Sequence, residues 1–156
     1  MCLVIDSCCL AMVFDKGNKR HSDFEPVARW VLVGKGKMIY GGQKYKGELK
    51  KAKFIIPIMA ELDRSGRLVH LRDSEVDARA RELKEDINDN GFNDEHVVAM
   101  VVVSRCSVVC TDDRLAIQVL KYRHVYYRYK MKPPKIYRYA RHRNMCTDEN
   151  LAAICR

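Results

Sequence analysis

Short apolar runs, each followed by polar residues, recur along the chain and predict strands separated by helices. We predict buried strands over four segments, 2–6, 38–40, 68–71 and 107–111. Apolar residues at helical spacing predict helices over 7–14, 24–33, 43–52, 54–62, 73–87, 94–103 and 113–122. This alternation predicts an α/β protein with a parallel sheet and helices on both of its faces.

Serines, a proline and an Asn-rich turn set the expected element boundaries. We expect Ser7 and Ser74 to cap the helices that follow them, because serine is favoured at that position. Pro26 fits the first turn of the helix over 24–33. The sequence Asn-Asp-Asn-Gly at 88–91 is expected to end the preceding helix.

Two of the predicted strands end directly in acidic residues. Asp6 follows the first run, and Asp112 and Asp113 follow the apolar run at 108–110. In an open α/β sheet, ligands bind beyond the carboxyl ends of the strands. If these two strands are parallel neighbours, their carboxylates meet at one edge and destabilise the site unless a cation is bound. An all-oxygen set of ligands suits Mg²⁺ or Mn²⁺.

Length and composition favour one soluble domain over residues 1–156. The chain has 156 residues, and no apolar run approaches the roughly 18 that a membrane helix needs. The first residues lack the basic start of a signal peptide, so we expect a cytoplasmic protein without membrane contact. The seven cysteines cannot all pair internally and show no paired C-x-x-C spacing, so we interpret them as mostly reduced thiols.

The net charge of +9 favours an anionic partner, of which nucleic acid is the commonest, although a merely basic surface fits equally well. Basic and aromatic residues interleave over 121–143, with Pro133 and Pro134 between the two halves. In one interpretation the aromatic rings stack on unpaired RNA bases while the cations meet phosphates. In the other, either half is an edge strand whose basic residues face water.

Four acidic motifs recur in order along residues 2–120. They are Leu3-Val-Ile-Asp6, Glu48 within Lys46-Gly-Glu-Leu49, Asn93-Asp94 before Val97, and Val109-Cys-Thr-Asp-Asp113. Together they resemble the pattern of PIN-domain nucleases, which is a strand ending in Asp, an acid in a mid-chain helix, an Asp before a later helix, and a strand followed by Thr-x-Asp.

The resemblance implies a three-layer α/β/α fold with a short central parallel sheet, and a metal-dependent endoribonuclease that cuts single-stranded RNA. The expected catalytic residues, which also hold Mg²⁺ or Mn²⁺, are Asp6, Glu48, Asp94 and Asp113. Asp112 is expected as an additional metal ligand. By analogy, the protein is expected to be the toxin of a toxin–antitoxin pair, with an antitoxin protein as partner, and a homodimer.

Further residues are expected to contact the substrate. Ser7 and Thr111 match the hydroxyl positions of the family pattern. The basic-aromatic segment contributes Arg123, Tyr127, Arg128 and Arg138. His96 lies close to Asp94 in sequence and is a weaker candidate for substrate contact.

The acidic residues other than Asp6 also have a structural interpretation, whereas an acid directly after a buried strand has few structural uses. Asp94, Asp112 and Asp113 could serve only as helix caps. Glu48 could pair with Lys44 or Lys51 at helical spacing. The competing functions are a catalytically inert PIN-like protein that binds RNA or acts as a scaffold through the basic-aromatic segment, and a phosphoacceptor resembling a response regulator. Retention of all four acids favours the nuclease.

Overall fold

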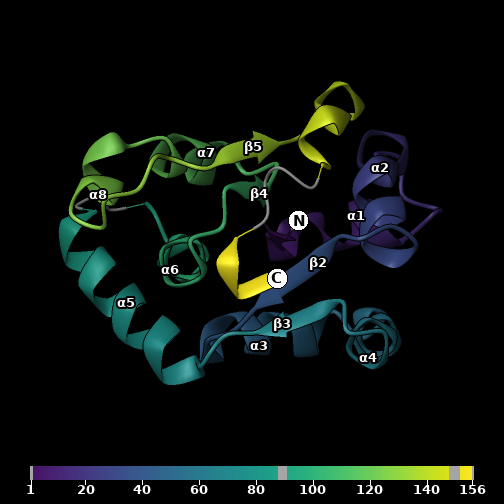
Figure 1. The fold of residues 1–156 in the computed structure, drawn as a ribbon, viewed down its shortest axis with the longest axis horizontal. Coiled ribbons are helices and arrows are strands. Elements are labelled where there is room, and N and C mark those ends of the chain that lie inside the picture. The colour runs from purple at the N-terminus through teal and green to yellow at the C-terminus, as the bar shows by residue number, and fades with distance from the viewer. Residues whose placement is uncertain (1, 88–90, 148–151, 156) are drawn as a thin grey trace.

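The computed structural model describes residues 2–87, 91–147 and 152–155 as a sheet flanked by helices (Figure 1). The strands are β1 (Cys2–Ile5), β2 (Lys37–Tyr40), β3 (Leu68–His70), β4 (Val108–Cys110) and β5 (Lys135–Tyr137). The α-helices are α1 (Leu10–Phe14), α2 (His21–Leu32), α3 (Gln43–Lys51), α4 (Ile55–Arg64), α5 (Asp73–Asp86), α6 (Glu95–Ser104), α7 (Arg114–Leu120) and α8 (Arg123–Tyr127). The 3₁₀ helices are η1 (Ser7–Cys9), η2 (Ala140–Met145) and η4 (Ala153–Cys155).

The sheet is entirely parallel and its strand order is β3-β2-β1-β4-β5. Val4 of the central strand pairs with Ile39 on one side and with Val109 on the other. The chain therefore builds outward from β1 to β3 and then returns to place β4 on the opposite side of β1. This reversal creates a topological switch point at the carboxyl ends of β1 and β4, where ligands bind in open α/β sheets.

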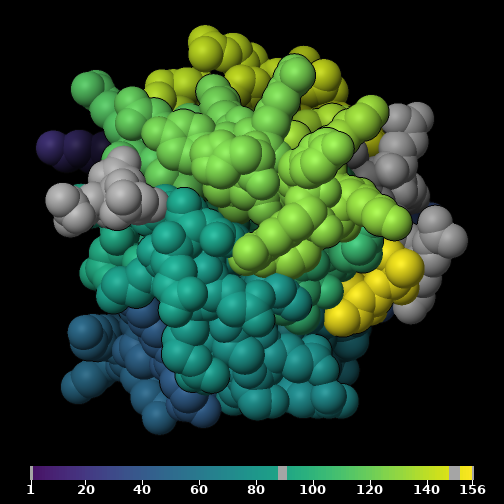
Figure 2. All heavy atoms as spheres, turned by 90° about the vertical axis from the view of Figure 1, so that its left-hand side faces the viewer, coloured from purple at the N-terminus to yellow at the C-terminus, as the bar shows by residue number. Residues whose placement is uncertain are grey.

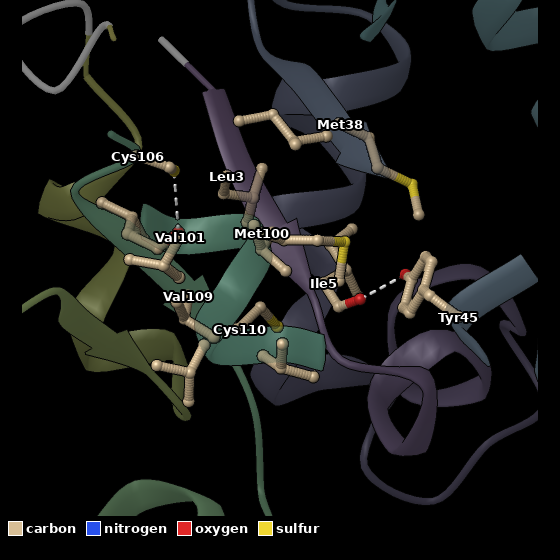
Figure 3. Packing of buried hydrophobic residues seen from close by; sticks show 14 of the residues in the cluster. Leu3, Ile5, Met38, Tyr45, Met100, Val101, Cys106, Val109 and Cys110 are labelled. Atoms are coloured by element: carbon tan, nitrogen blue, oxygen red, sulfur yellow. Dashed lines mark hydrogen bonds between the residues drawn. The ribbon is translucent and has the colours of Figure 1, made fainter. Parts of the chain in front are cut away.

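Strand β1 and helix α6 form the centre of the core. All four residues of β1 are buried, and every residue of α6 except Val103 is buried. Helix α6 packs against β1 and β2, and Met100 lies close to Leu3 and Ile5 (Figure 3). In Figure 1, α1 and α2 lie on one side of the sheet and α5 and α6 on the other. Because both faces are covered, the central strands β1 and β4 are continuously apolar and buried rather than alternating.

The structure confirms the predicted α/β class and its parallel central sheet. The four predicted strands and the predicted helices beyond residue 20 are present, with ends shifted by a few residues. The prediction of one continuous helix over 7–14 is wrong, because the 3₁₀ helix η1 precedes α1. The N-cap position of η1 is occupied by Asp6, not by Ser7. Ser74 likewise lies inside α5, and the cap position belongs to Arg72.

Helix α2 begins earlier than the sequence predicts. The side chain of Asn18 accepts a hydrogen bond from the Arg20 amide at 2.9 Å, and the Asn18 carbonyl accepts one from the His21 amide at 2.9 Å. This turn starts the helix at His21 and places Pro26 inside it rather than in its first turn. The predicted break over 88–91 falls largely outside the described residues.

The basic-aromatic segment divides into a helix and a strand. Its first half forms α8, because Val125 and Tyr126 are both buried, which a strand with alternating faces would not allow. Its second half contains β5, the edge strand beside β4, as one interpretation predicted. Figure 2 shows this light-green segment lying over the teal helix α5. Arg128 anchors it there through an ion pair with Asp86 at 2.5 Å.

The two ends of the described chain meet beside the sheet (Figure 1). A disulfide joins Cys2 of β1 to Cys155 of η4, with 6.2 Å between the Cα atoms. The expectation of mostly reduced thiols holds for the other cysteines, which are free: Cys8, Cys9, Cys106, Cys110 and Cys146. Among the described residues, no helix combines the length and apolar character needed to cross a membrane.

Candidate metal centre

Asp6 joins the ends of β1 and β4 at the switch point. Its side chain is almost fully buried, and one carboxylate oxygen accepts a hydrogen bond from the Thr111 hydroxyl at 2.6 Å. Its backbone amide donates to the Cys110 carbonyl at 2.8 Å. Tyr45 of α3 donates its hydroxyl hydrogen to the carbonyl of Ile5, which ties that helix to the same strand end (Figure 3). The Asp6 carboxylate is therefore held directly by Thr111, while contacts from β4 and α3 fix the backbone on which it lies.

Asp94 brings a second carboxylate to this region from the start of α6. It occupies the N-cap position, yet its side chain makes no capping hydrogen bond. The pKa of Asp94 is raised to about 6, first by burial and then by the negative charges of Asp6 and Asp113. Lys44 opposes this increase in pKa, and Glu48 adds to it. The four predicted acids therefore share one electrostatic neighbourhood, and the geometry does not support the simple capping interpretation of Asp94.

Glu48 pairs with His96 rather than with a lysine of its own helix. The Glu48 Oε2 atom lies 3.2 Å from Nε2 of His96, which is 2% exposed. Ligand atoms from Glu48, Asp94 and His96 all lie within 4.8 Å of one another, so this group is able to hold a metal ion. Burial lowers the pKa of His96 and favours the neutral imidazole, which is the form that binds metals.

Lys44 braces the two elements that carry this group. Its ammonium group donates a hydrogen bond to Oδ1 of Asn93 at 2.8 Å and another to the Asn93 carbonyl. It also lies 3.8 Å from a carboxylate oxygen of Glu95. These contacts hold α3, which carries Glu48, against the start of α6, which carries Asp94 and His96.

Asp113 combines a capping role with a place in the acidic neighbourhood. One of its carboxylate oxygens accepts a hydrogen bond from the Ala116 amide at 2.7 Å, so it is the N-cap of α7. Its own amide donates to the Thr111 hydroxyl at 3.2 Å. The capping interpretation is therefore correct for this residue, while its charge still contributes to the raised pKa of Asp94.

Asp112 faces arginines instead of the other acids. One carboxylate oxygen accepts a hydrogen bond from Arg20 at 2.9 Å, and the other accepts one from Nε of Arg138. Partial burial raises the pKa of Asp112, but the two guanidinium groups lower it by more. The pKa of Asp112 therefore lies below its ordinary value. Both oxygens are thus occupied by cationic donors, so the geometry favours a counter-ion role over the expected metal-ligand role.

The residues expected to contact substrate are divided between two regions. Ser7, Thr111 and Arg138 follow strand ends on the acidic side of the sheet, but Thr111 is fully buried and bonded to Asp6. Arg123 and Tyr127 on α8, and Arg128 at its C-terminal end, are exposed beside α5. The structure therefore does not bring the six residues together as one surface.

Sequence reasoning missed three partners of this region. His96 was considered only for substrate contact, although a histidine at the start of an otherwise apolar helix signals a buried polar role. Lys44 was considered only as a partner of Glu48. Arg20 lies 92 residues from Asp112, and nothing in the sequence links them.

A separate hollow of about 520 Å³ lies between α3 and α4. Its walls are largely apolar and include Leu49, Ile55 and Met59, with Lys46 and Lys50 among the polar lining residues. Glu48 is not part of this lining. This hollow therefore belongs to another surface of α3 and lacks the convergent carboxylates of the candidate metal centre.

No protein-family model matches this chain, and no curated protein sequence or solved structure matches it either.

Proposed function

We propose that the protein is a metal-dependent endoribonuclease of the PIN type that cleaves single-stranded RNA. The observation that carries the proposal is the convergence of Glu48, Asp94 and His96, whose ligand atoms lie within 4.8 Å of one another. The negative charges of Asp6 and Asp113 act on the same group, since they help to raise the pKa of Asp94. These acids come from four different parts of the chain. Gathering like charges at a strand edge is unfavourable unless a cation is part of the functional state.

The residues present fit a divalent cation. Ligand atoms of Glu48, Asp94 and His96 converge within 4.8 Å of one another. We assign Asp6 and Asp113 to the same donor set because their charges act on Asp94. Carboxylate oxygens suit Mg²⁺ and Mn²⁺, whereas an imidazole nitrogen is a ligand more typical of Zn²⁺ or Fe²⁺. The Nδ1 atom of His96 is buried and, within the described part of the chain, has no hydrogen-bond partner.

The chain's own residues fix the geometry that such a reaction needs. A divalent cation, when bound, supplies a lowered pKa for water and relief of negative charge on the phosphate. Thr111 holds one oxygen of Asp6 in place, so this carboxylate does not have to reorganise when RNA binds. Lys44 and Asn93 keep the two sides of the donor set together. Both contacts are preorganising features of the site.

The test is cleavage of a fluorophore-labelled single-stranded RNA with Mg²⁺ or Mn²⁺. We expect Asp6→Asn and Asp113→Asn to lower the cleavage rate by about 10²-fold or more, since each loses a carboxylate ligand. Asn can still accept the hydrogen bond from Thr111 at position 6 and can still cap α7 at position 113. Asp63→Asn, at an exposed position on α4, is the matched control and should cleave normally.

The same variants separate the nuclease from its competitor. Cleavage that is absent from the native protein, or that survives both substitutions, would overturn the proposal. RNA binding without cleavage would instead favour the inert RNA-binding protein. The toxin role, the antitoxin partner and the homodimer belong to the same proposal and rest on the PIN resemblance alone.

A further inference from the structure

Three guanidinium groups surround the ring of Tyr139. The Cζ atoms of Arg20, Arg138 and Arg141 lie 5.5, 5.2 and 4.6 Å from the ring centroid. Arginines on an aromatic face gain a cation–π interaction but repel one another. Such a gathering attracts anions, because a nearby negative charge relieves the repulsion.

The carboxylates beside these arginines balance only part of this charge. Arg20 forms ion pairs with Asp23 and Asp112 at 2.8 and 2.9 Å, and Arg138 forms one with Asp112. Arg141 is exposed and, within the part of the chain that the structure describes, forms no ion pair. Three positive charges therefore face two negative charges, and the unbalanced one lies on the outermost guanidinium.

The arginine group is built into the fold rather than scattered over a flexible surface. Arg20 also lies over the Phe24 ring at 5.5 Å, and it donates a hydrogen bond to the Arg138 carbonyl at 3.4 Å. The Arg138 amide donates to Nδ1 of His142 at 3.1 Å. These contacts join α2, the end of β5 and η2, and with Asp112 they hold the guanidinium groups of Arg20 and Arg138 in place before any ligand arrives.

The position of this group relates it to the acids. Asp112, its counter-ion, is bonded in sequence to Thr111, which holds Asp6, and to Asp113, which contributes to the acidic neighbourhood. Consecutive Cα atoms are only about 3.8 Å apart. The acidic and the basic groups therefore adjoin each other at the end of β4.

We infer that Arg20, Arg138, Arg141 and Tyr139 form a phosphate-binding subsite for single-stranded RNA beside the acidic centre. The inference rests on the proposed nuclease function and assigns the part of the substrate that lies next to the cleaved bond. Arginine suits this role because its planar group binds phosphate oxygens with paired hydrogen bonds. Without RNA, Asp112 holds Arg20 and Arg138 in place through ion pairs. When RNA binds, a phosphate replaces Asp112 as the partner of these arginines.

The test is binding of a short single-stranded RNA with a 5′ fluorophore, followed by fluorescence anisotropy in EDTA over a series of salt concentrations. We expect Arg141→Gln to weaken binding about threefold to tenfold and to reduce the salt slope by about 0.7, because one phosphate contact is lost. Arg81→Gln is the matched control. Arg81 is an exposed arginine on α5 for which the structure gives no ion pair among the described residues.

A second variant tests the role of Asp112 with an effect of opposite sign. Asp112→Asn removes the anion that competes for Arg20 and Arg138, so RNA should bind about threefold more tightly in EDTA. Equal effects of Arg141→Gln and Arg81→Gln would overturn the subsite, as would unchanged or weaker binding by Asp112→Asn. EDTA prevents metal-dependent cleavage during the binding measurement. If RNA binding depends on Arg141 but the protein shows no Mn²⁺-dependent cleavage, the nuclease proposal is overturned and the subsite is not.

Discussion

Protonation of Asp94 couples the stability of the protein to its candidate chemistry. Its pKa of about 6 in the folded state lies above the ordinary value of 3.8. The fold therefore holds the Asp94 proton more tightly than the unfolded chain does. The resulting stabilisation is fully present below about pH 4 and is lost as the pH rises through about 6. At neutral pH the ionised carboxylate is a cost to the fold.

Asp94→Asn should therefore stabilise the protein at pH 7 in EDTA. A neutral side chain of the same size avoids the cost of the buried charge and has no capping hydrogen bond to lose. We expect a gain on the order of 1 kcal/mol, discounted for partial exposure, which corresponds to about 2–4 °C in Tm. Thermal unfolding monitored by circular dichroism at pH 4 to 8 measures this gain.

Asp63→Asn serves as the control for this measurement, because its carboxyl is exposed on α4. The difference in Tm between Asp94→Asn and the native protein should shrink as the pH falls below about 6. A variant that is less stable than the native protein at neutral pH would contradict the assigned origin of the pKa shift.

The acidic residues of the candidate site could be predicted from the sequence, but most of their partners could not. Asp6 and Asp113 follow apolar strands directly, which is a local signal. The pairing of Glu48 with His96 spans 48 residues, and that of Asp112 with Arg20 spans 92. Such contacts depend on the crossing of elements in three dimensions, and a single sequence carries no period or spacing that reveals them.

At the scale of the elements, the strands were predictable because each is a short apolar run with a polar end. Helix α8 was not, because its sequence Arg-His-Val-Tyr-Tyr shows neither alternation nor a helical stripe. Two adjacent residues, Val125 and Tyr126, are buried there, and the surrounding charges are held by α5. Tertiary contacts, rather than local preference, therefore decide the structure of this segment.

Two buried tyrosines on different helices should respond to the same substitution with opposite signs. The Tyr126 hydroxyl of α8 is buried and finds no hydrogen-bond partner among the residues that the structure describes, whereas the Tyr45 hydroxyl of α3 donates to the Ile5 carbonyl. Tyr126→Phe should raise the free energy of unfolding by roughly 1 kcal/mol, and Tyr45→Phe should lower it by roughly 1 kcal/mol. Urea denaturation of both variants measures the difference.

The two tyrosine variants control for each other, because both replace a fully buried phenol with the same ring. Changes of the same sign in the two free energies would show that ring packing, rather than hydrogen bonding, determines the response.

At the scale of the whole molecule, the disulfide between Cys2 and Cys155 constrains nearly the full length of the chain. Cys155→Ser should lower the free energy of unfolding by roughly 2–4 kcal/mol in oxidising buffer, because the unfolded chain regains its freedom. The difference from the native protein should vanish once a reductant is added to both. Cys146→Ser, which removes a free thiol, is the control.

Thiol titration of the denatured native protein provides an independent check. Five thiols should react without reductant, which is the number of cysteines outside the disulfide. Seven reactive thiols would contradict the bridge, and no difference between Cys155→Ser and Cys146→Ser would deny it a stabilising role.

The bridge also changes the covalent topology of the molecule. Between Cys2 and Cys155 the backbone and the disulfide together form a closed ring. A protease that cuts any one exposed loop of this ring opens it without releasing a fragment, so the two pieces stay covalently linked until the sulfurs are reduced. Both halves of a cleaved chain would then remain close enough to reassemble around the same sheet.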